Sequence, residues 1–223
     1  MDFVFDPSLV LYLPLYEIDG SSLMSGDACG RLCTVTGALW RPNGRWFDAT
    51  DDVITVPDHT AITDIFDGGG TFIAWINPAS DGEEDGGCVA RKEAGWLVAV
   101  HGEAGGYVNL TLYQFFSGND GQWNFASAII PINTFSQVAV TYDNGAVGND
   151  PSLYFNGVSQ TPDEARTPTE TRGSDTGEDL LVGNRAAGDK AWDNLICEIM
   201  VYNRTLTPQE IQHNYLATKW RYR

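Results

Sequence analysis

Five short β-type segments follow one another in the middle of the chain. They are Cys88 to Arg91, Gly95 to Val100, Tyr107 to Phe116, Trp123 to Ala128 and Phe135 to Tyr142. Turns that contain glycine, asparagine or aspartate separate most of them, because these residues suit the backbone angles and hydrogen bonds of a tight turn. Short strands at this spacing predict an antiparallel β-sandwich or barrel.

The flanking segments extend the all-β pattern. Residues 9–16 form a compact apolar run that is typical of a strand buried on both faces, and Thr71 to Ile76 predict another strong strand. Asn156-Gly157 lies between two β-type runs and predicts a hairpin, because both turn residues need a positive φ. We expect residues 21–33 to be irregular and the polar residues 160–178 to form a long exposed loop.

The C-terminal part of the chain predicts one short helix. Thr207 is the expected N-cap, Pro208 occupies the first helical position, and Glu210 can reach back to the cap. The helix is expected to run to about Thr218. No linker divides the sequence, so we expect residues 1–223 to form a single domain.

The chain is strongly acidic, with 30 acidic against 13 basic residues and a formal net charge of -17. This balance argues against nucleic acid, whose binding depends on Lys and Arg that neutralise phosphate, and against anionic membrane surfaces. It is compatible with calcium, with neutral glycans or with solubility alone. No apolar run approaches the ~20 residues of a membrane span, so we expect no membrane insertion.

The beginning of the sequence carries no visible targeting signal. Its first residues, Met-Asp-Phe-Val-Phe-Asp-Pro, lack the basic start and the apolar core of a secretory signal. The localisation therefore stays open, and a virion component and an extracellular protein are both compatible with the sequence.

Four cysteines, Cys29, Cys33, Cys88 and Cys197, allow three pairings. A zinc site would need two close pairs, and only Cys29 and Cys33 are close in sequence. Free thiols or one disulfide are therefore favoured over a zinc site.

An acidic turn joins two β-type runs between Gly44 and Pro57. Asp48, Asp51 and Asp52 are gathered in it, after Trp46-Phe47 and before Val53. Three carboxylates so close together repel one another unless water, a basic side chain or a cation screens them. The segment is therefore either a solvated turn or part of a cation site.

Six segments, taken in order, resemble one family. They are Gly44 to Pro57, Thr71 to Pro78, Phe135 to Asp143, Leu153 to Val158, Leu181 to Asn184 and Glu198 to Ile211. In this order and spacing the chain resembles the laminin-G-like, concanavalin A-like jelly-roll domain. The resemblance implies an all-β, two-sheet antiparallel jelly-roll sandwich, to which the sequence adds a short C-terminal helix. It also implies binding of a glycan or protein ligand, often with calcium, while related sandwiches include glycoside hydrolases and polysaccharide lyases.

The resemblance also implies a set of calcium ligands. By position, a structural ion would be held by Asp19 or Asp27, by the turn at Asp48 and by Asp193. The family usually has glycine after the residue that matches Asp48, whereas Ala49 stands here. That departure questions whether the turn keeps the family's backbone conformation.

The sequence offers no recognisable catalytic group. The nearest match to the acidic strand motif of related hydrolases is Glu83-Glu84-Asp85, with Cys88 where the second glutamate should be. His59, His101 and His213 are widely separated and favour structural or surface roles. We therefore expect a protein that is not an enzyme.

Aromatic side chains are the candidate platforms for a sugar. Trp96, Tyr107, Tyr113, Phe115, Phe116 and Trp123 lie on the middle strands. Tyr113 and Phe115 share one face, because side chains alternate along a strand. Trp123 follows a polar turn at a strand start and is the best candidate for an exposed platform. The predicted ligand-binding residues are Trp96, Tyr113 and Trp123, although burial is the common state of such residues.

The sequence thus favours a non-catalytic recognition module, carbohydrate-binding or adhesive, with a structural calcium. One alternative is a phage or virion structural or decoration protein that binds no sugar and makes virion or homo-oligomer contacts. Another is a glycan-active hydrolase or lyase whose catalytic residues are not recognised.

Overall fold

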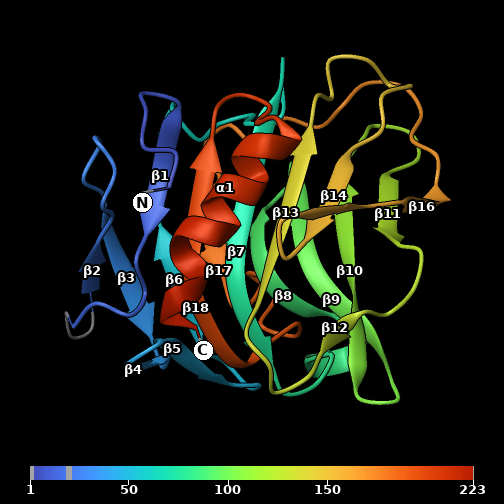
Figure 1. The fold of residues 1–223 in the computed structure, drawn as a ribbon. Coiled ribbons are helices and arrows are strands. Elements are labelled where there is room, and N and C mark those ends of the chain that lie inside the picture. The colour runs from blue at the N-terminus through green and yellow to red at the C-terminus, as the bar shows by residue number, and fades with distance from the viewer. Residues whose placement is uncertain (1–2, 19–21, 223) are drawn as a thin grey trace.

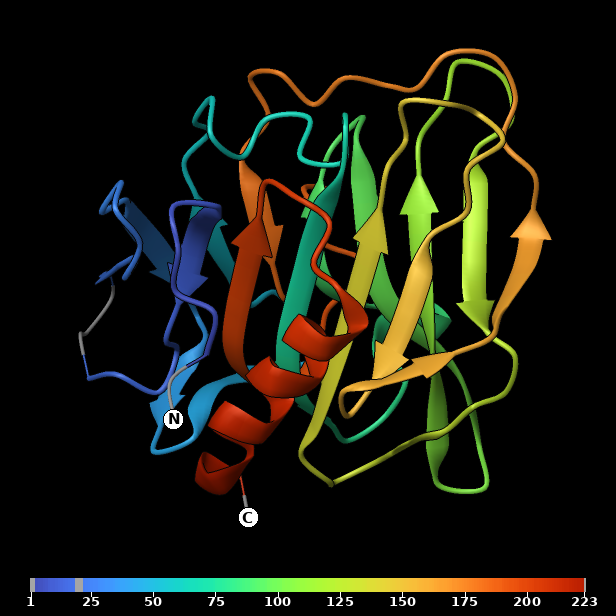
Figure 2. The same ribbon diagram turned by 45° about the horizontal axis from the view of Figure 1, so that its top comes forward.

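The computed structural model describes residues 3–18 and 22–222, and in it two antiparallel β-sheets pack face to face (Figure 1). The helix α1 (Pro208–Thr218) lies over the outer face of one of them, which we call sheet A (Figure 2). The other is sheet B. The expected all-β, two-sheet antiparallel jelly-roll sandwich with a short C-terminal helix is confirmed.

Sheet A has eight strands in the order β15-β14-β13-β7-β18-β5-β4, with β1 also paired to β18. Their bounds are β1 Leu9–Leu13, β4 Leu39–Arg41, β5 Gly44–Asp48, β7 Gly70–Pro78, β13 Ser136–Tyr142, β14 Ser152–Phe155, β15 Val158–Gln160 and β18 Asp193–Tyr202. The longest of these strands, β7 and β18, pair with each other in the middle of the sheet.

Sheet B has ten strands in the order β16-β11-β10-β9-β8-β17-β6-β3-β2, with β12 also paired to β10. Their bounds are β2 Ser22–Met24, β3 Leu32–Thr36, β6 Val53–Val56, β8 Gly87–Lys92, β9 Trp96–Ala104, β10 Tyr107–Gln114, β11 Gly121–Phe125, β12 Ile130–Pro131, β16 Pro162–Arg166 and β17 Leu180–Val182. Short 3-10 turns, η1 (Glu83–Asp85) and η2 (Lys219–Arg221), complete the elements.

The two sheets bury a large apolar core between them. From β9, Trp96, Val98 and Val100 point into it, and from β10 so do Leu110 and Leu112. Because successive side chains of a strand point to opposite faces, the residues between them lie on the outer face of sheet B. That outer face is the surface on which a ligand could reach the strands.

Two expectations about irregular segments are wrong. Residues 160–178 contain the strand β16, which pairs with β11 at the edge of sheet B (Figures 1 and 2). Within residues 21–33, β2 pairs with β3 at the opposite edge. Neither strand is clear in the sequence: β16 reads Pro-Asp-Glu-Ala-Arg and is almost wholly exposed, and β2 has only three residues, Ser-Leu-Met. Backbone pairing with a neighbouring strand, rather than an apolar pattern, makes these segments strands.

The helix α1 is capped as the sequence predicts. Thr207 accepts a hydrogen bond from the Glu210 backbone N–H, and the Glu210 carboxylate accepts from the Thr207 backbone N–H at 2.8 Å. Ile211 then packs against Ile73 of β7 and Met200 of β18. The cap therefore fixes where the helix begins, and apolar packing holds it on sheet A.

Arg204 joins the helix cap to the N-terminal segment. Its guanidinium lies 2.7 Å from a Glu210 oxygen and 2.8 Å from an Asp6 oxygen. The hydrogen bond from Arg204, with those from Thr207, holds the pKa of Glu210 down to about 2. The ionised carboxylate is thus part of the folded structure.

We expect Glu210 to make stability fall in acid. Its pKa is lower in the folded protein than in the unfolded chain, so its contribution is full above about pH 4.5 and is lost as the pH falls towards 2. Because solvent screens this pair, the expected loss is about 1 kcal/mol. Urea unfolding between pH 6 and pH 3 should therefore be less pH-dependent in Glu210→Gln than in the wild type. Glu164→Gln, on exposed β16, is the matched control, and an equal effect in both variants would contradict the assignment.

None of the four cysteines forms a disulfide: Cys29 is exposed, and Cys33, Cys88 and Cys197 are buried. Burial raises the pKa of the Cys88 thiol to about 12. Across the described residues, no helix has the length and apolar character needed to cross a membrane.

Candidate functional site

A groove of about 360 Å³ lies on the outer face of sheet B, and we call it the outer groove. Its floor is formed by β9 and β10, its sides by loops, and its size falls in the range of small-molecule sites. Its lining includes the side chains of Arg91, His101, Thr111, Tyr113, Phe115 and Gln122.

Strand alternation explains which residues reach the outer groove. On β9, Ala99 and His101 point outward, and on β10 Thr111 and Tyr113 do the same. Phe115 continues this row directly after the end of β10. The expectation that Tyr113 and Phe115 share a face is confirmed, and the small side chain of Ala99 leaves the hollow between them and the loops.

The aromatic floor is held in place by neighbours. The Tyr113 hydroxyl donates to Gln122 Oε1 at 2.6 Å, and the Arg166 guanidinium lies 5.9 Å from the ring centre. The Arg91 guanidinium lies over the Phe115 ring at 5.0 Å. Such contacts fix the orientation of rings that remain partly open to solvent.

Three polar atoms in the lining make no hydrogen bond to any described residue. They are Nε2 of His101, Oγ1 of Thr111 and Nε of Arg91, and all three atoms are buried. Buried polar atoms are almost always satisfied by protein, water or a ligand, because leaving them unpaired costs free energy. The outer groove therefore presents donors and acceptors that solvent or a bound polar molecule can satisfy.

Two loops form the sides of the outer groove. The loop between β17 and β18 supplies Arg185 and Lys190, and the segment at η1 supplies Asp85. Lys190 Nζ donates to the Glu84 backbone oxygen at 2.8 Å and so ties the two loops together. Asp85 in turn accepts from the Gly102 backbone N–H and joins η1 to β9.

The predicted platforms Trp96 and Trp123 are buried in the core, so the expected exposure of Trp123 is wrong. The Trp123 side chain is 0 % exposed, and its Nε1 donates to Asp150 Oδ1 at 2.9 Å. The ring lies over Gly121, where an added Cβ would come within 2.2 Å of it. Gly121, the first residue of β11, thus makes room for the indole on the inner face. Of the three predicted ligand-binding residues, only Tyr113 lines the outer groove.

Most residues of the outer groove carry no clear signal in the sequence. His101 was expected to have a structural or surface role, and no sequence motif marks Arg91, Arg185 or Lys190. Alternation along β9 and β8 could have placed His101 and Arg91 on the outer face. No local signal places Arg185 and Lys190, because their loop reaches the groove through the tertiary fold.

The acidic turn gathers Asp48, Asp51 and Asp52, each with a carboxylate oxygen within 4.8 Å of the others. Asp48 and Asp51 are exposed and Asp52 is buried, with Asp52 Oδ2 accepting from the Asp48 backbone N–H at 2.9 Å. Burial, together with the charges of Asp48 and Asp51, raises the pKa of Asp52, although that hydrogen bond opposes the rise. This donor set suits calcium, which prefers carboxylate and carbonyl oxygens.

The other predicted calcium ligands lie in different surroundings. Asp193 of β18 is directly opposite Asp48 of β5, while its carboxylate accepts from Ser80 Oγ at 2.7 Å. Asp27 is buried in an ion pair with Arg31 at 3.0 Å and accepts from the Tyr12 backbone N–H. It does not join the acidic turn, so the structure offers no support for it as a ligand. Asp19 lies outside the described residues.

Ala49 keeps the left-handed backbone that glycine would adopt. Its φ is 63°, and its N–H donates to the Trp192 backbone oxygen at 3.1 Å. A residue with a Cβ pays roughly 1–2 kcal/mol in this region. Alanine in place of the family's glycine therefore adds strain to the turn but leaves its backbone conformation unchanged.

We expect Ala49→Gly to stabilise the protein by about 0.5–1 kcal/mol. It relieves the left-handed strain, and the greater freedom of glycine in the unfolded chain offsets part of the gain. Thermal or urea unfolding measures the change. Ala146→Gly is the control, because Ala146 is exposed and has no positive φ, and it should be neutral or slightly destabilising. A loss of stability in Ala49→Gly would contradict this account.

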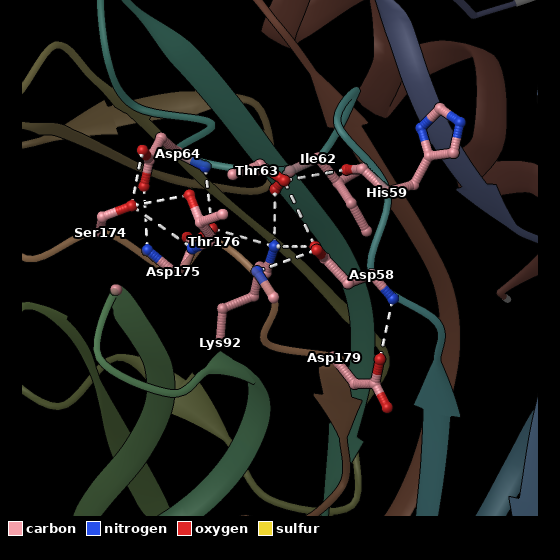
Figure 3. Close-up of polar contacts among 12 residues, drawn as sticks. Asp58, His59, Ile62, Thr63, Asp64, Lys92, Ser174, Asp175, Thr176 and Asp179 are labelled. Carbon is pink, nitrogen blue, oxygen red and sulfur yellow. Dashed lines mark hydrogen bonds and ion pairs between the residues drawn. The ribbon is translucent and has the colours of Figure 1, made fainter.

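A second polar cluster surrounds Lys92 of β8 (Figure 3). Lys92 Nζ lies 2.9 Å from an oxygen of Asp58 and 2.9 Å from one of Asp175, and it donates to the Ile62 backbone oxygen at 3.2 Å. Asp175 also accepts from the Asp64 backbone N–H at 2.8 Å. The ammonium thus has acceptors for its three protons.

Lys92 and Asp175 are buried, whereas Asp58 is partly open to solvent. Burial raises the pKa of Asp175 despite its hydrogen bonds from Asp64 and Lys92. For Asp58, burial opposes ionisation, but the hydrogen bond and charge of Lys92 outweigh it and lower the pKa. The contacts of the cluster join β8 to the loops at 57–69 and 167–179.

The comparisons with known proteins agree with this architecture. A scan against family models matches residues 48–212 to the Concanavalin A-like lectin/glucanases superfamily. The chain belongs to this family, and its fold is a lectin-like jelly roll. A search of the curated proteins found no match.

Several solved structures share the fold at low sequence identity. The receptor binding domain of botulinum neurotoxin mosaic serotype C/D has a TM-score of 0.66 and 14% identity, over 95% of this chain and 51% of that one. Trypanosoma rangeli sialidase in complex with the inhibitor DANA has a TM-score of 0.67 and 13% identity, over 96% of this chain and 33% of that one. A third structure is Domain 4 of AbnA, an extracellular arabinanase from Geobacillus stearothermophilus, in complex with arabinotriose. It has a TM-score of 0.62 and 18% identity, over 92% of this chain and 97% of that one. The chain thus spans about half of the neurotoxin domain and a third of the sialidase.

Proposed function

We propose that this chain is a non-catalytic carbohydrate-binding domain whose ligand lies in the outer groove. The observation that carries the proposal is an aromatic floor, Tyr113 and Phe115, beside buried polar atoms that lack partners among the described residues. Sugars present apolar C–H faces and polar hydroxyls, so they suit a site that combines aromatic surface with a few placed polar groups. Among similar folds, the arabinanase domain was solved with arabinotriose, which supports recognition of a glycan.

The acidic residues near the outer groove support a binding role rather than hydrolysis. A glycosidase needs two carboxyl groups on either side of the scissile bond. In the described part of the lining, Asp85 supplies the one carboxylate, and it already accepts from Gly102. Glu83 and Glu84 lie with it on η1, a 3-10 turn, rather than on a strand of sheet B.

A glycan array with the purified protein tests the proposal. We expect binding to a defined sugar, weakened about tenfold or more by Tyr113→Ala or Phe115→Ala, because residues that anchor a ligand commonly contribute over 1.4 kcal/mol. Tyr107→Ala is the matched control: Tyr107 is an exposed tyrosine of the same strand and does not line the outer groove. Absence of binding to any glycan would overturn the proposal and favour a protein-binding or assembly role.

We further propose that Asp48, Asp51 and Asp52 hold a structural calcium ion. Three carboxylates in one turn repel one another, and a divalent cation would remove that repulsion. Asp193, opposite Asp48 in the sheet, adds a fourth negative charge close by. The ion would stabilise the turn that links β5 to β6, on a part of the chain separate from the lining of the outer groove.

Thermal unfolding in calcium and in a chelator tests this second proposal. Calcium at 100 times its Kd should stabilise the wild type by about 2.7 kcal/mol, and Asp51→Asn should lose most of that gain. Asp163→Asn, an exposed aspartate on β16, should keep it. An unchanged Tm on adding calcium would overturn the proposal, and calcium-dependent glycan binding would contradict a purely structural ion.

A further inference from the structure

The outer groove is basic, although the protein as a whole is acidic. Among the described residues that line it, Arg91, Arg185 and Lys190 are basic and Asp85 alone is acidic, while the chain carries a net charge of -17. In a chain with 13 basic residues, three of them converge on this one hollow. The basic character belongs to the lining itself, because each of the three bases is paired with an acid that does not line the groove, and an anionic group on a ligand would suit such a lining.

Each of these bases has an acidic neighbour that lies farther out. Arg91 pairs with Glu93, Arg185 with Asp189, and Lys190 with Glu84. In every pair the basic side chain is the less exposed member, and none of the three acids lines the outer groove. The acids are thus the more exposed partners, and the bases are the partners that line the groove.

Arg91 keeps donor capacity for a ligand. Its guanidinium lies over the Phe115 ring at 5.0 Å, which orients it, and its Nε bonds to no described residue. The five N–H groups of an arginine form a planar fork that matches a carboxylate. His101 Nε2 and Thr111 Oγ1, also without partners in the described chain, are further polar groups of the same lining.

We infer that the outer groove binds a sugar that carries a carboxylate, such as a uronic or sialic acid. This inference rests on the proposed carbohydrate-binding function and adds the class of its ligand. The sugar ring contacts Tyr113 and Phe115, and its carboxylate accepts from Arg91 with Arg185 or Lys190 close by. Ion pairs at a protein surface are weak, so the ligand can compete for these cations with Glu93, Asp189 and Glu84.

The negative charge of the rest of the protein limits the size of the anion that the outer groove can bind. Salt of physiological strength screens charges beyond about 8 Å, so the basic lining acts on a ligand inside the groove while distant acids act weakly. Long polyanions such as nucleic acids also meet the acidic surface around the groove and are repelled. We therefore expect recognition of a single acidic sugar or a short acidic oligosaccharide.

The test compares acidic and neutral sugars on one array, followed by calorimetry with a matched ligand pair. The array holds uronate-containing, sialylated, sulfated and neutral oligosaccharides. The pair is the best-bound acidic oligosaccharide and its methyl ester, which keeps the shape and removes the charge. We expect the ester to bind at least tenfold more weakly, and we expect rising salt to weaken the acid more than the ester.

Single substitutions locate the effect. Arg91→Gln and Arg185→Gln should each weaken binding of the acidic sugar about tenfold and change binding of the ester little. Arg91→Lys keeps the charge and loses the fork, so it should fall between wild type and Arg91→Gln. Arg41→Gln is the charge-matched control, because Arg41 is exposed on β4 of the other sheet. Thermal unfolding of every variant identifies any that fails to fold. The comparison of the acidic oligosaccharide with its methyl ester uses the wild-type protein, so it does not depend on how the variants fold.

The outcomes separate this inference from the function on which it rests. Groove-dependent binding of neutral sugars, with acid and ester equal, would overturn the acidic ligand and leave the carbohydrate-binding function standing. Binding of sulfated sugars alone would overturn the carboxylate as the recognised group. Absence of binding to every sugar on the array would overturn both.

Discussion

Replacing Lys92 with methionine should lower the free energy of unfolding by about 3–5 kcal/mol, because removing one member of a buried ion pair leaves the other charge unpaired. The carboxylate left behind is that of Asp175, whose side chain is 1% exposed. Asp58, the second partner, is partly open to solvent and can recover water. The expected loss therefore comes mainly from Asp175, and urea unfolding at neutral pH measures it.

A matched substitution and a double variant sharpen this prediction. Lys219→Met removes a lysine from the partly exposed surface of the C-terminal segment and should change stability by less than about 0.5 kcal/mol. In Lys92→Met/Asp175→Asn the unpaired charge is gone, so the double variant should be more stable than the sum of the two single changes allows. Strict additivity, or a loss in Lys92→Met no larger than in Lys219→Met, would show that the cluster contributes little.

Replacing Trp123 with alanine should lower the free energy of unfolding by about 3–5 kcal/mol, the usual cost of truncating a buried large aromatic side chain. The ring is enclosed, packs against Tyr142 at 5.2 Å between centres, and covers Gly121. The truncation leaves a cavity between the sheets and also removes the hydrogen bond to Asp150. Thermal and urea unfolding should both report the loss.

Tyr113→Ala provides the contrasting case. Tyr113 is only partly buried and lies on the outer face, so its loss should cost much less stability and fall on ligand binding instead. Folded Trp123→Ala, assayed below its melting temperature, should bind with nearly wild-type affinity per folded molecule. The reverse pattern, with binding lost in Trp123→Ala and stability unchanged, would restore Trp123 as a ligand platform.

Trp96 and Trp123, both buried in the core, show why a residue type alone does not identify a binding site. Aromatic residues serve both as core and as platform, and one step along a strand exchanges the two faces. In β10 and β11, Leu112 pairs with Trp123 and Tyr113 with Gln122. That register puts the indole inside and leaves Tyr113 outside, where Gln122 holds its hydroxyl.

The acidic turn was predicted in part and by two different routes. Asp48, Asp51 and Asp52 are neighbours in the sequence, so their proximity is a local property that the sequence shows directly. Asp193 was placed beside Asp48 through the family resemblance, and the pairing of β5 with β18 puts the two directly opposite. Asp27, placed by the same resemblance, is held by Arg31 instead.

What the sequence by itself determined is local: most strands, the turns between them, the capped helix at Thr207 and the gathered carboxylates of the acidic turn. Alternation, turn chemistry and capping act over a few residues, so they can be read without the fold. Only the tertiary structure decided that β16 and β2 are edge strands, that Trp123 is core, and that Lys92 meets Asp175. It also brought Arg185 and Lys190 to the same groove as Arg91 and Tyr113. These arrangements join residues far apart in the chain, and they depend on sheet register and loop path, which no short stretch of sequence specifies.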